Sequence, residues 1–114
     1  LVFGNNDADI YNHMKACPEN VRLLGRFYID HVDGKIIALI HGDIEGSAEA
    51  LFKSGDYDIV IRGHSHVAEV RKKDGRLLLN PGSLVSPLND FPRWTPSSVA
   101  ILDTVAVDAK IVKL

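Results

Sequence analysis

The amino-acid sequence predicts a single globular domain of the α/β class over residues 1–114. Helical spacing follows strand-like apolar segments in the first half of the chain, and hairpin patterns follow in the second half. The composition is that of an ordinary globular domain, with 46% hydrophobic and 25% charged residues. Glycine and proline are spread among turns, so no linker divides the chain. Together these observations favour an α/β sandwich.

The N-terminal segment predicts the end of a strand followed by a short helix. Residues 1–3 are apolar and lead into a polar loop. Residues 9–16 have helical spacing that ends before Cys17-Pro18, because proline disfavours a helical conformation in the residue before it. The chain opens on leucine and not on methionine, so we expect the natural polypeptide to begin upstream.

A hairpin and a second helix are predicted next. Residues 27–32 and 35–41 flank Asp33-Gly34, a dipeptide that readily adopts the positive φ angles of a tight turn. After this hairpin, apolar residues recur at helical spacing, and Gly55 stands where a left-handed C-terminal cap is expected. The apolar positions of this helix are Ile44, Ala48, Leu51 and Phe52.

The second half of the chain predicts strands. Residues 58–62 are apolar and β-branched, which is typical of a buried strand. Asp74-Gly75 predicts the turn of a second hairpin. Residues 81–96 hold four of the five prolines and are expected to be mostly irregular. The remaining strands are expected at residues 67–72, 76–80, 99–102 and 106–112.

The composition excludes several classes of protein. Thirteen basic residues against fifteen acidic ones give a net charge of -2, so no basic field exists to hold a nucleic-acid backbone. No apolar run is long enough to span a membrane, and no signal peptide is recognisable. The single cysteine, Cys17, rules out an internal disulfide and suits a cytoplasmic protein. The sequence is compatible with a homo-oligomer and does not determine the oligomeric state.

Polar clusters follow three of the predicted strands. They are Gly4-Asn5-Asn6-Asp7, His41-Gly42-Asp43 and Gly63-His64-Ser65-His66. Ligands gather at the carboxyl ends of strands in open α/β sheets, so we expect these clusters to converge. Imidazole nitrogens together with amide or carboxylate oxygens suit manganese, iron, nickel or zinc. In an extended strand, His64 and His66 would share one face.

Each cluster also has a purely structural interpretation. Asn5, Asn6 and Asp7 could form an Asx turn or cap a helix, and Asp43 could be the N-cap of the helix that begins near Ile44. The two clustered histidines could be a solvated turn pair. Asn80-Pro81-Gly82-Ser83 is most simply a turn, although its backbone amides could face an anion. His13 and His31 are interpreted as structural.

The order of these four motifs resembles that of the calcineurin-like metallophosphoesterase superfamily, especially its small bacterial and archaeal phosphodiesterase branch, over nearly the whole chain. The resemblance implies a four-layer α/β/β/α sandwich with a two-metal site at the strand ends. By position, Asn5, His41 and His64 would bind one metal and His66 the other. The resemblance further implies Asp7 as a catalytic residue and contacts to substrate from Asn6, Asn80, Gly82 and Ser83.

The sequence departs from the family pattern at three places. The family's Asp-x-His and Gly-Asp motifs, with the metal-bridging aspartate, would precede Leu1, so we expect this chain to be an N-terminally truncated, C-terminal part of the domain. Asn6 replaces the histidine that donates a proton in many relatives, and an amide does not perform that role. Asp43 replaces the second histidine of a common His-Gly-His motif.

The resemblance implies hydrolysis of a small phosphoester, with manganese as the favoured metal and nickel, iron or zinc as alternatives. Without a proton donor at Asn6, a phosphodiester with an acidic alcohol or aryl leaving group is favoured. The competing hypothesis is a catalytically inactive protein-binding scaffold, because the retromer subunit of the same fold acts in that way.

Overall fold

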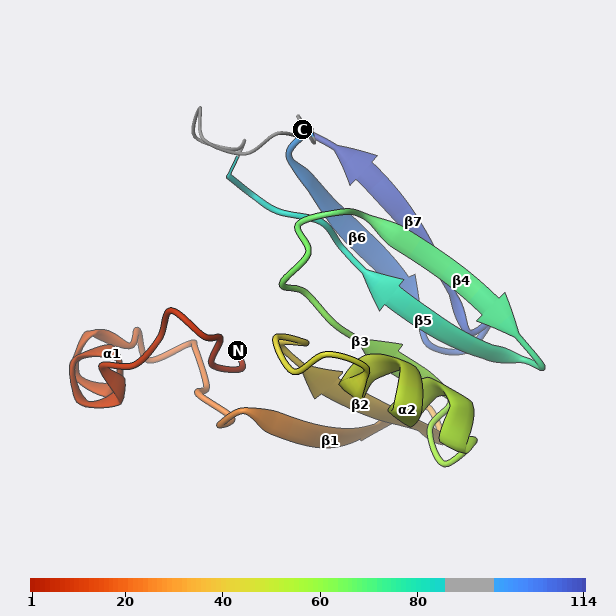
Figure 1. Ribbon diagram of the computed structural model, residues 1–114, viewed down its shortest axis with the longest axis horizontal. Helices are drawn as coiled ribbons and strands as arrows, with labels where there is room; N and C mark the ends of the chain where they lie inside the picture. The colour runs from red at the N-terminus through yellow and green to blue at the C-terminus, as the bar shows by residue number, and fades with distance from the viewer. Residues whose placement is uncertain (86–95) are drawn as a thin grey trace.

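The computed structural model describes residues 1–85 and 96–114 (Figure 1). Most of the predicted irregular segment, residues 86–95, lies outside the described part of the chain. In chain order the elements are α1 (Ile10–Ala16), β1 (Phe27–Val32), β2 (Lys35–Ile40), α2 (Ser47–Ser54), β3 (Ile59–Ile61), β4 (Glu69–Lys73), β5 (Arg76–Asn80), β6 (Ser98–Asp103) and β7 (Asp108–Lys113).

Five of the strands form one mixed sheet in the order β1-β2-β3-β5-β4. The three central strands, β2, β3 and β5, run parallel, and the two outer strands are antiparallel to their neighbours. The carboxyl ends of the central strands therefore meet at one edge of the sheet. This edge carries His41 and the loop that begins at Gly63.

Both Asp-Gly hairpins are confirmed. Asp33-Gly34 joins β1 to β2 and Asp74-Gly75 joins β4 to β5, with φ between 51° and 74° at all four residues. Strands β6 and β7 pair with each other as a separate two-stranded sheet. The predicted strand boundaries differ from the observed ones by at most two residues at each end.

Helix α2 begins later than its apolar spacing predicts. Ile44 is 69% exposed and lies in a turn, where its carbonyl accepts hydrogen bonds from the Ser47 backbone and hydroxyl. Gly46, with φ of 76°, is the N-cap, so Asp43 does not cap the helix. The predicted left-handed cap at Gly55 is confirmed by its φ of 80°.

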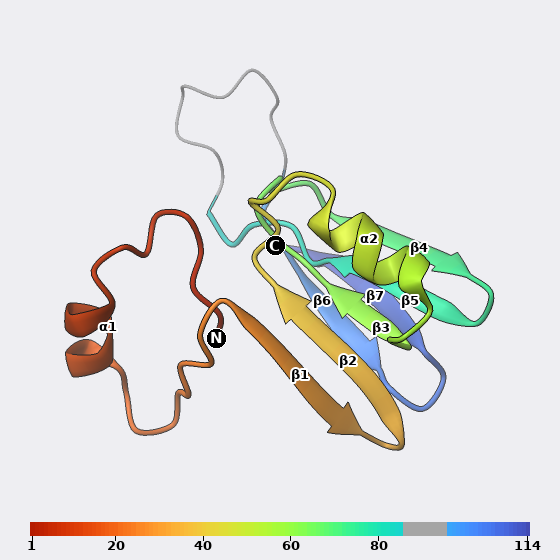
Figure 2. The ribbon, with the colours of Figure 1, turned by 60° about the horizontal axis from the view of Figure 1, so that its bottom comes forward.

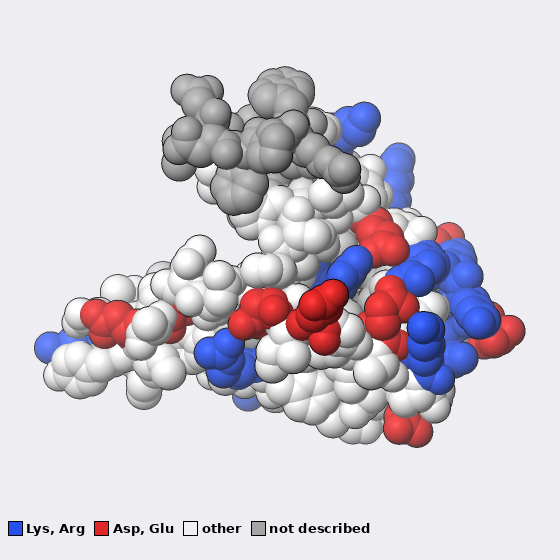
Figure 3. All heavy atoms as spheres, viewed as in Figure 1, with Lys and Arg blue, Asp and Glu red and all other residues white. Residues whose placement is uncertain are grey.

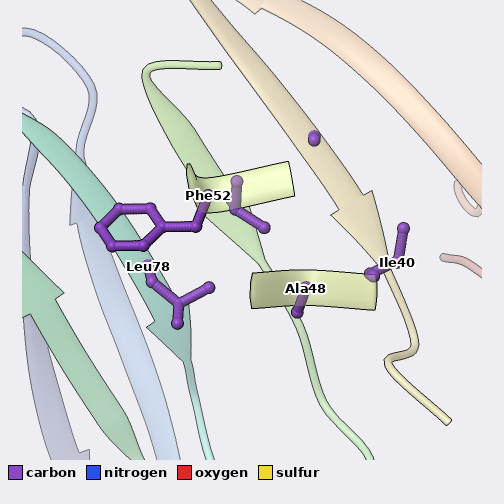
Figure 4. Close-up of a cluster of buried hydrophobic side chains, with 6 residues drawn as sticks. Ile40, Ala48, Phe52 and Leu78 are labelled. Atoms are coloured by element: carbon purple, nitrogen blue, oxygen red, sulfur yellow. The ribbon is translucent and has the colours of Figure 1, made fainter. Parts of the chain in front are cut away.

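Two apolar clusters hold the layers together. On one face of the five-stranded sheet, Ala48 and Phe52 of α2 pack on Ala38, Ile40, Val60 and Leu78 (Figure 4). On the opposite face, Ile37, Ile59, Leu77 and Leu79 are covered by side chains of the β6–β7 hairpin. Figure 2 shows the resulting order of layers, helix on sheet on sheet. Burial of both sheet faces explains why the central strands are almost continuously apolar.

The N-terminal segment lies apart from these layers. Residues 1–3 are not a strand, although three hydrogen bonds join their backbone to the opposite segment, from Leu1 N to Arg22 O, from Phe3 N to Gly25 O and from Leu24 N to Leu1 O. Helix α1 follows as predicted, with Asp9 as its N-cap, but none of its residues is buried. In Figures 1 and 2 it stands beside the sandwich and covers neither sheet.

The α/β class and the sandwich arrangement are thus confirmed. The described residues supply three layers of an α/β/β/α sandwich, namely α2, the five-stranded sheet and the β6–β7 pair. No helix within residues 1–85 or 96–114 is long and apolar enough to cross a membrane.

Candidate metal centre

The site is built where β2 and β3 end side by side. His41 directly follows β2, and Gly63 N donates a hydrogen bond of 2.9 Å to the His41 carbonyl. This bond extends the parallel pairing of β2 and β3 by one step, although both strands have formally ended. It brings the His41 and His64 side chains to the same edge of the sheet.

Three polar side chains converge at this edge. His41 Nε2 lies 2.8 Å from Asn5 Oδ1 and 3.3 Å from His64 Nδ1. The two imidazole rings meet edge to face, with 5.1 Å between centroids. Polar atoms of Asn5 and His64 thus both lie within hydrogen-bond distance of the same ring nitrogen of His41.

This arrangement fits a metal ion. Donor atoms at about 2.1 Å from a metal are separated by about 3.0 to 3.4 Å in octahedral or tetrahedral geometry. The distances of 2.8 and 3.3 Å in the cluster are close to that range. One amide oxygen and two imidazole nitrogens form a mixed donor set of the kind that manganese, iron, nickel and zinc accept. Asn5 and His64 are exposed, which leaves the centre open to solvent.

His41 is electrostatically suited to such a role. Partial burial lowers its pKa from the ordinary value, and the neighbouring imidazoles of His64 and His66 lower it further. The carboxylates of Asp43 and Asp7 oppose this shift without reversing it. The lowered pKa favours the neutral imidazole, which is the form that binds metals.

Gly4 permits the close approach of the N-terminal loop to His41. A Cβ atom at this position would lie 2.9 Å from Cε1 of the His41 ring. Only glycine therefore allows the loop to cross the imidazole and bring the next residue, Asn5, against Nε2. The motif glycine acts through the absence of a side chain.

Asp7 is directed into its own loop. Its Oδ2 accepts a 2.7 Å hydrogen bond from Gly4 N, and its Oδ1 lies 3.4 Å from His13 Nε2. No sequence pattern indicates this pair, because it forms only when the fold brings His13 on α1 to the loop. Asn6, the position predicted to contact substrate, is exposed.

The sequence allows the histidine motif to be part of an extended strand, but the structure shows that it is not. Strand β3 ends at Ile61, and both His64 and His66 have positive φ angles, 65° and 58°. The alternation of faces in a strand therefore does not apply to this pair. His66 is exposed and close enough to His41 to affect its pKa.

The carboxylate of Asp43 is occupied elsewhere. Its Oδ2 accepts a hydrogen bond of 3.1 Å from Arg26 Nη2. Within the described residues, no group of three or more histidine, cysteine, aspartate or glutamate side chains could hold a metal. The centre around His41 depends on the asparagine amide as its third donor.

The Asn-Pro-Gly-Ser segment lies just behind the histidine loop. Asn80 is completely buried, and its amide nitrogen donates to Gly63 O and Ser65 Oγ. Gly82 N donates to the Asn80 side-chain oxygen, while the Ser83 hydroxyl donates to Val85 O. The structure therefore places Asn80 in contact with the loop that carries His64.

Basic residues gather at the other end of the sheet. A cavity of about 390 Å³ at this end is lined by five basic residues, Lys53, Arg71, Lys72, Lys73 and Arg76, together with Glu49, Phe52 and Asp74. Figure 3 shows part of this blue cluster at the right, over the β4–β5 hairpin. Since this hairpin turn is at the amino end of β5, the cavity is separate from the histidine centre at the carboxyl end.

Several known proteins are similar in sequence to this chain. A family model described as the calcineurin-like phosphoesterase superfamily domain matches residues 1–106. The phosphodiesterase MJ0936 of Methanocaldococcus jannaschii is 30% identical over 106 residues, covering 90% of this chain and 60% of that protein. A probable metallophosphoesterase of Methanothermobacter thermautotrophicus is 34% identical over 84 residues, covering 68% of this chain and 46% of the relative. The chain thus spans 46–60% of the length of these curated relatives.

Solved structures share the fold. An archaeal phosphodiesterase superposes with a TM-score of 0.78 at 28% identity, covering 99% of this chain and 67% of the other. Vps29 of Entamoeba histolytica, solved with Zn²⁺, superposes with a TM-score of 0.62 at 22% identity, over 91% of this chain and 73% of the other. The Vps29 likeness concerns the fold alone. With its family model matched from residue 1 to residue 106, the chain belongs to the calcineurin-like phosphoesterase superfamily.

Proposed function

We propose that this chain carries the histidine-containing part of a metal-dependent phosphodiesterase. The observation that carries the proposal is the convergence of Asn5, His41 and His64 at the carboxyl ends of two parallel strands. In the proposed site these three residues bind one divalent metal. His66 is proposed as a ligand of a second metal, whose other ligands would come from outside these 114 residues.

The proposed substrate class comes from the relatives. The M. jannaschii protein is named a phosphodiesterase, and so is the archaeal protein of known structure. Both are similar to nearly the full length of this chain. We therefore assign hydrolysis of a small phosphodiester to the protein of which this chain is the whole or a part.

Manganese is the proposed metal, with nickel, iron and zinc as alternatives, since all four accept mixed nitrogen and oxygen donors. When bound, such a metal lowers the pKa of a coordinated water and neutralises charge that develops on the phosphate. The protein residues hold it without reacting themselves. The neutral state of His41 favours metal binding at pH 7.

The residues beside the centre restrict the substrate. Asn6 cannot protonate a leaving alkoxide, and Asp7 is bonded to Gly4 and paired with His13. No strong acid in this loop is therefore directed at a leaving group. Phosphodiesters whose leaving group is a stable anion, such as an aryl oxide or an acidic alcohol, fit this site.

The test is hydrolysis of a chromogenic aryl phosphodiester by the natural full-length protein with Mn²⁺. We expect metal-dependent turnover that is lost in His41→Ala and His64→Ala. His31→Ala is the matched control, because His31 is an exposed histidine on β1 outside the centre. Metal binding without any turnover would contradict the enzymatic assignment and would favour a binding scaffold of the same fold.

A further inference from the structure

Two polar residues are buried within the described part of the chain, and one of them contacts the histidine loop directly. They are Asn80, which is 0% exposed, and Ser98, which is 4% exposed. The Asn80 amide nitrogen donates to Gly63 O at 3.1 Å and to Ser65 Oγ at 2.9 Å. Gly63 and Ser65 are the immediate neighbours of His64, so one buried amide holds the chain on both sides of that histidine.

The loop needs such support because its backbone is strained. Ser65 N donates to Gly63 O at 2.8 Å, and His64 between them has φ of 65°. A three-residue turn with a positive central φ is rare and unfavourable for a residue that has a side chain. His66, with φ of 58°, adds a second residue of this kind. Left-handed conformations at non-glycine residues persist only where surrounding contacts fix them.

The turn that follows Asn80 is held from the second sheet. Its Oδ1 accepts a hydrogen bond from Gly82 N at 3.0 Å, and Ser98 Oγ donates to the Pro81 carbonyl at 2.8 Å. A Cβ atom at Gly82 would lie only 2.0 Å from Ser98 Oγ, and the φ of Gly82 is +87°. Ser98 on β6 therefore contacts the turn at Pro81 and Gly82, and this turn contacts Asn80, which bonds to the loop after β3.

We propose that Asn80, supported by Ser98, is a positioning residue for His64. Its amide holds residues 63–66 in the left-handed conformation that presents His64 Nδ1 to His41 Nε2, at 3.3 Å. The complete burial of Asn80 assigns it to this internal role, in place of the substrate contact predicted from the motif. The expected effect on metal affinity rests on the proposed function. The expected effect on the loop conformation is independent of that function.

The test is Asn80→Ala in the full chain, read by two methods. Hydrogen exchange follows the amides of Gly63 and Ser65, which donate to the His41 and Gly63 carbonyls. We expect these amides to exchange at least about tenfold faster and the Mn²⁺ affinity, measured by calorimetry, to fall about 10- to 100-fold, as for residues that orient metal ligands. Ser98→Ala should change both in the same direction. The neighbouring serine provides the control, because Ser97→Ala should change neither.

A milder variant covers the case in which Asn80→Ala does not fold. Ser65→Ala removes one of the two acceptors of the Asn80 amide from an exposed residue and should give a smaller change of the same sign. Unchanged exchange and Mn²⁺ affinity within about twofold of wild type in the folded variants would overturn the inference. If the wild-type protein binds no Mn²⁺, the proposed function fails, and amide exchange alone decides the role of Asn80.

Discussion

His41 and His64 are 23 residues apart in the chain, yet Nε2 of the first lies 3.3 Å from Nδ1 of the second. The parallel pairing of β2 with β3 creates this contact, because His41 follows the end of β2 and His64 follows the end of β3. Asn5 Oδ1 completes the group at 2.8 Å from His41 Nε2. The group provides three neutral donor atoms and no carboxylate. The number of metal ions that it can hold depends on this donor set.

We expect the 114-residue chain to retain at most one equivalent of a divalent transition metal after dialysis. Three neutral donors suffice for one ion with open positions, whereas no described cluster of histidines and carboxylates provides another site. Elemental analysis should show this equivalent lost in His41→Ala and in His64→Ala and kept in His31→Ala. Two tightly held equivalents would contradict the view that a bridging carboxylate is needed and lies outside this chain.

The 114-residue chain should hydrolyse an activated aryl phosphodiester very poorly with Mn²⁺. Two divalent cations held close together repel each other strongly, and neutral donors such as Asn5 and His41 do not offset this repulsion as a bridging carboxylate does. A polypeptide extended upstream through the family's Asp-x-His and Gly-Asp motifs should turn over the same substrate readily. A colorimetric assay compares the two polypeptides.

The His64→Ala variant of each polypeptide is the control for this comparison. Equal metal-dependent turnover by the short and the extended chain, abolished by that substitution in both, would show that the 114 residues form a complete site. Absence of turnover in both polypeptides would contradict the proposed activity itself.

Local chemistry explains what the sequence predicted well. Asp33-Gly34 and Asp74-Gly75 determine their turns through their own φ angles, so both hairpins were predicted within two residues. The predicted start of α2, near Ile44, was wrong because apolar spacing cannot distinguish a buried residue from an exposed one. Ile44 has the correct spacing but is 69% exposed in the preceding turn.

The convergence of Asn5, His41 and His64 was predicted from motif order, whereas other contacts around them were not. The Asp7–His13 pair depends on where α1 lies, and the contacts of Asn80 depend on how β5 sits beside the loop after β3. Both are tertiary arrangements for which neighbouring residues give no signal. The left-handed φ of His64 was missed for the same reason, since the Asn80 bonds that support it come from another strand.

Gly4→Ala should weaken metal binding while leaving the sandwich folded. The new Cβ would lie 2.9 Å from His41 Cε1, so either the ring or the N-terminal loop must move. Either movement separates Asn5 Oδ1 from Nε2, and we expect Mn²⁺ affinity to fall at least about tenfold. Calorimetry measures the affinity, and circular dichroism checks the fold. An unchanged Mn²⁺ affinity in Gly4→Ala would show that Asn5 is not a ligand, because displacement of its loop would then have no effect on metal binding.

The ion pair between Glu49 on α2 and Arg71 on β4 should make stability depend on acid pH. The hydrogen bond from Arg71 lowers the pKa of the Glu49 carboxyl below its ordinary value of 4.5. A lowered folded-state pKa means that the stabilisation is fully present above the unfolded-state pKa and is lost as the pH falls through the folded-state pKa. Both side chains are at least a third exposed, so solvent screening limits the effect to at most about 1 kcal/mol.

Urea unfolding of wild type and Glu49→Gln at pH 7 and at pH 3 measures this contribution. The variant keeps the shape of the side chain but cannot ionise, so its free energy of unfolding should be lower than that of wild type at pH 7. At pH 3 the difference should shrink, because this pH lies below the unfolded-state pKa, where the charge-dependent stabilisation of wild type decreases. A matched variant is Asp30→Asn, which neutralises an exposed carboxylate on β1, on the opposite edge of the sheet. An unchanged difference between wild type and Glu49→Gln at the two pH values would show that the pair contributes packing and no charge-dependent stability.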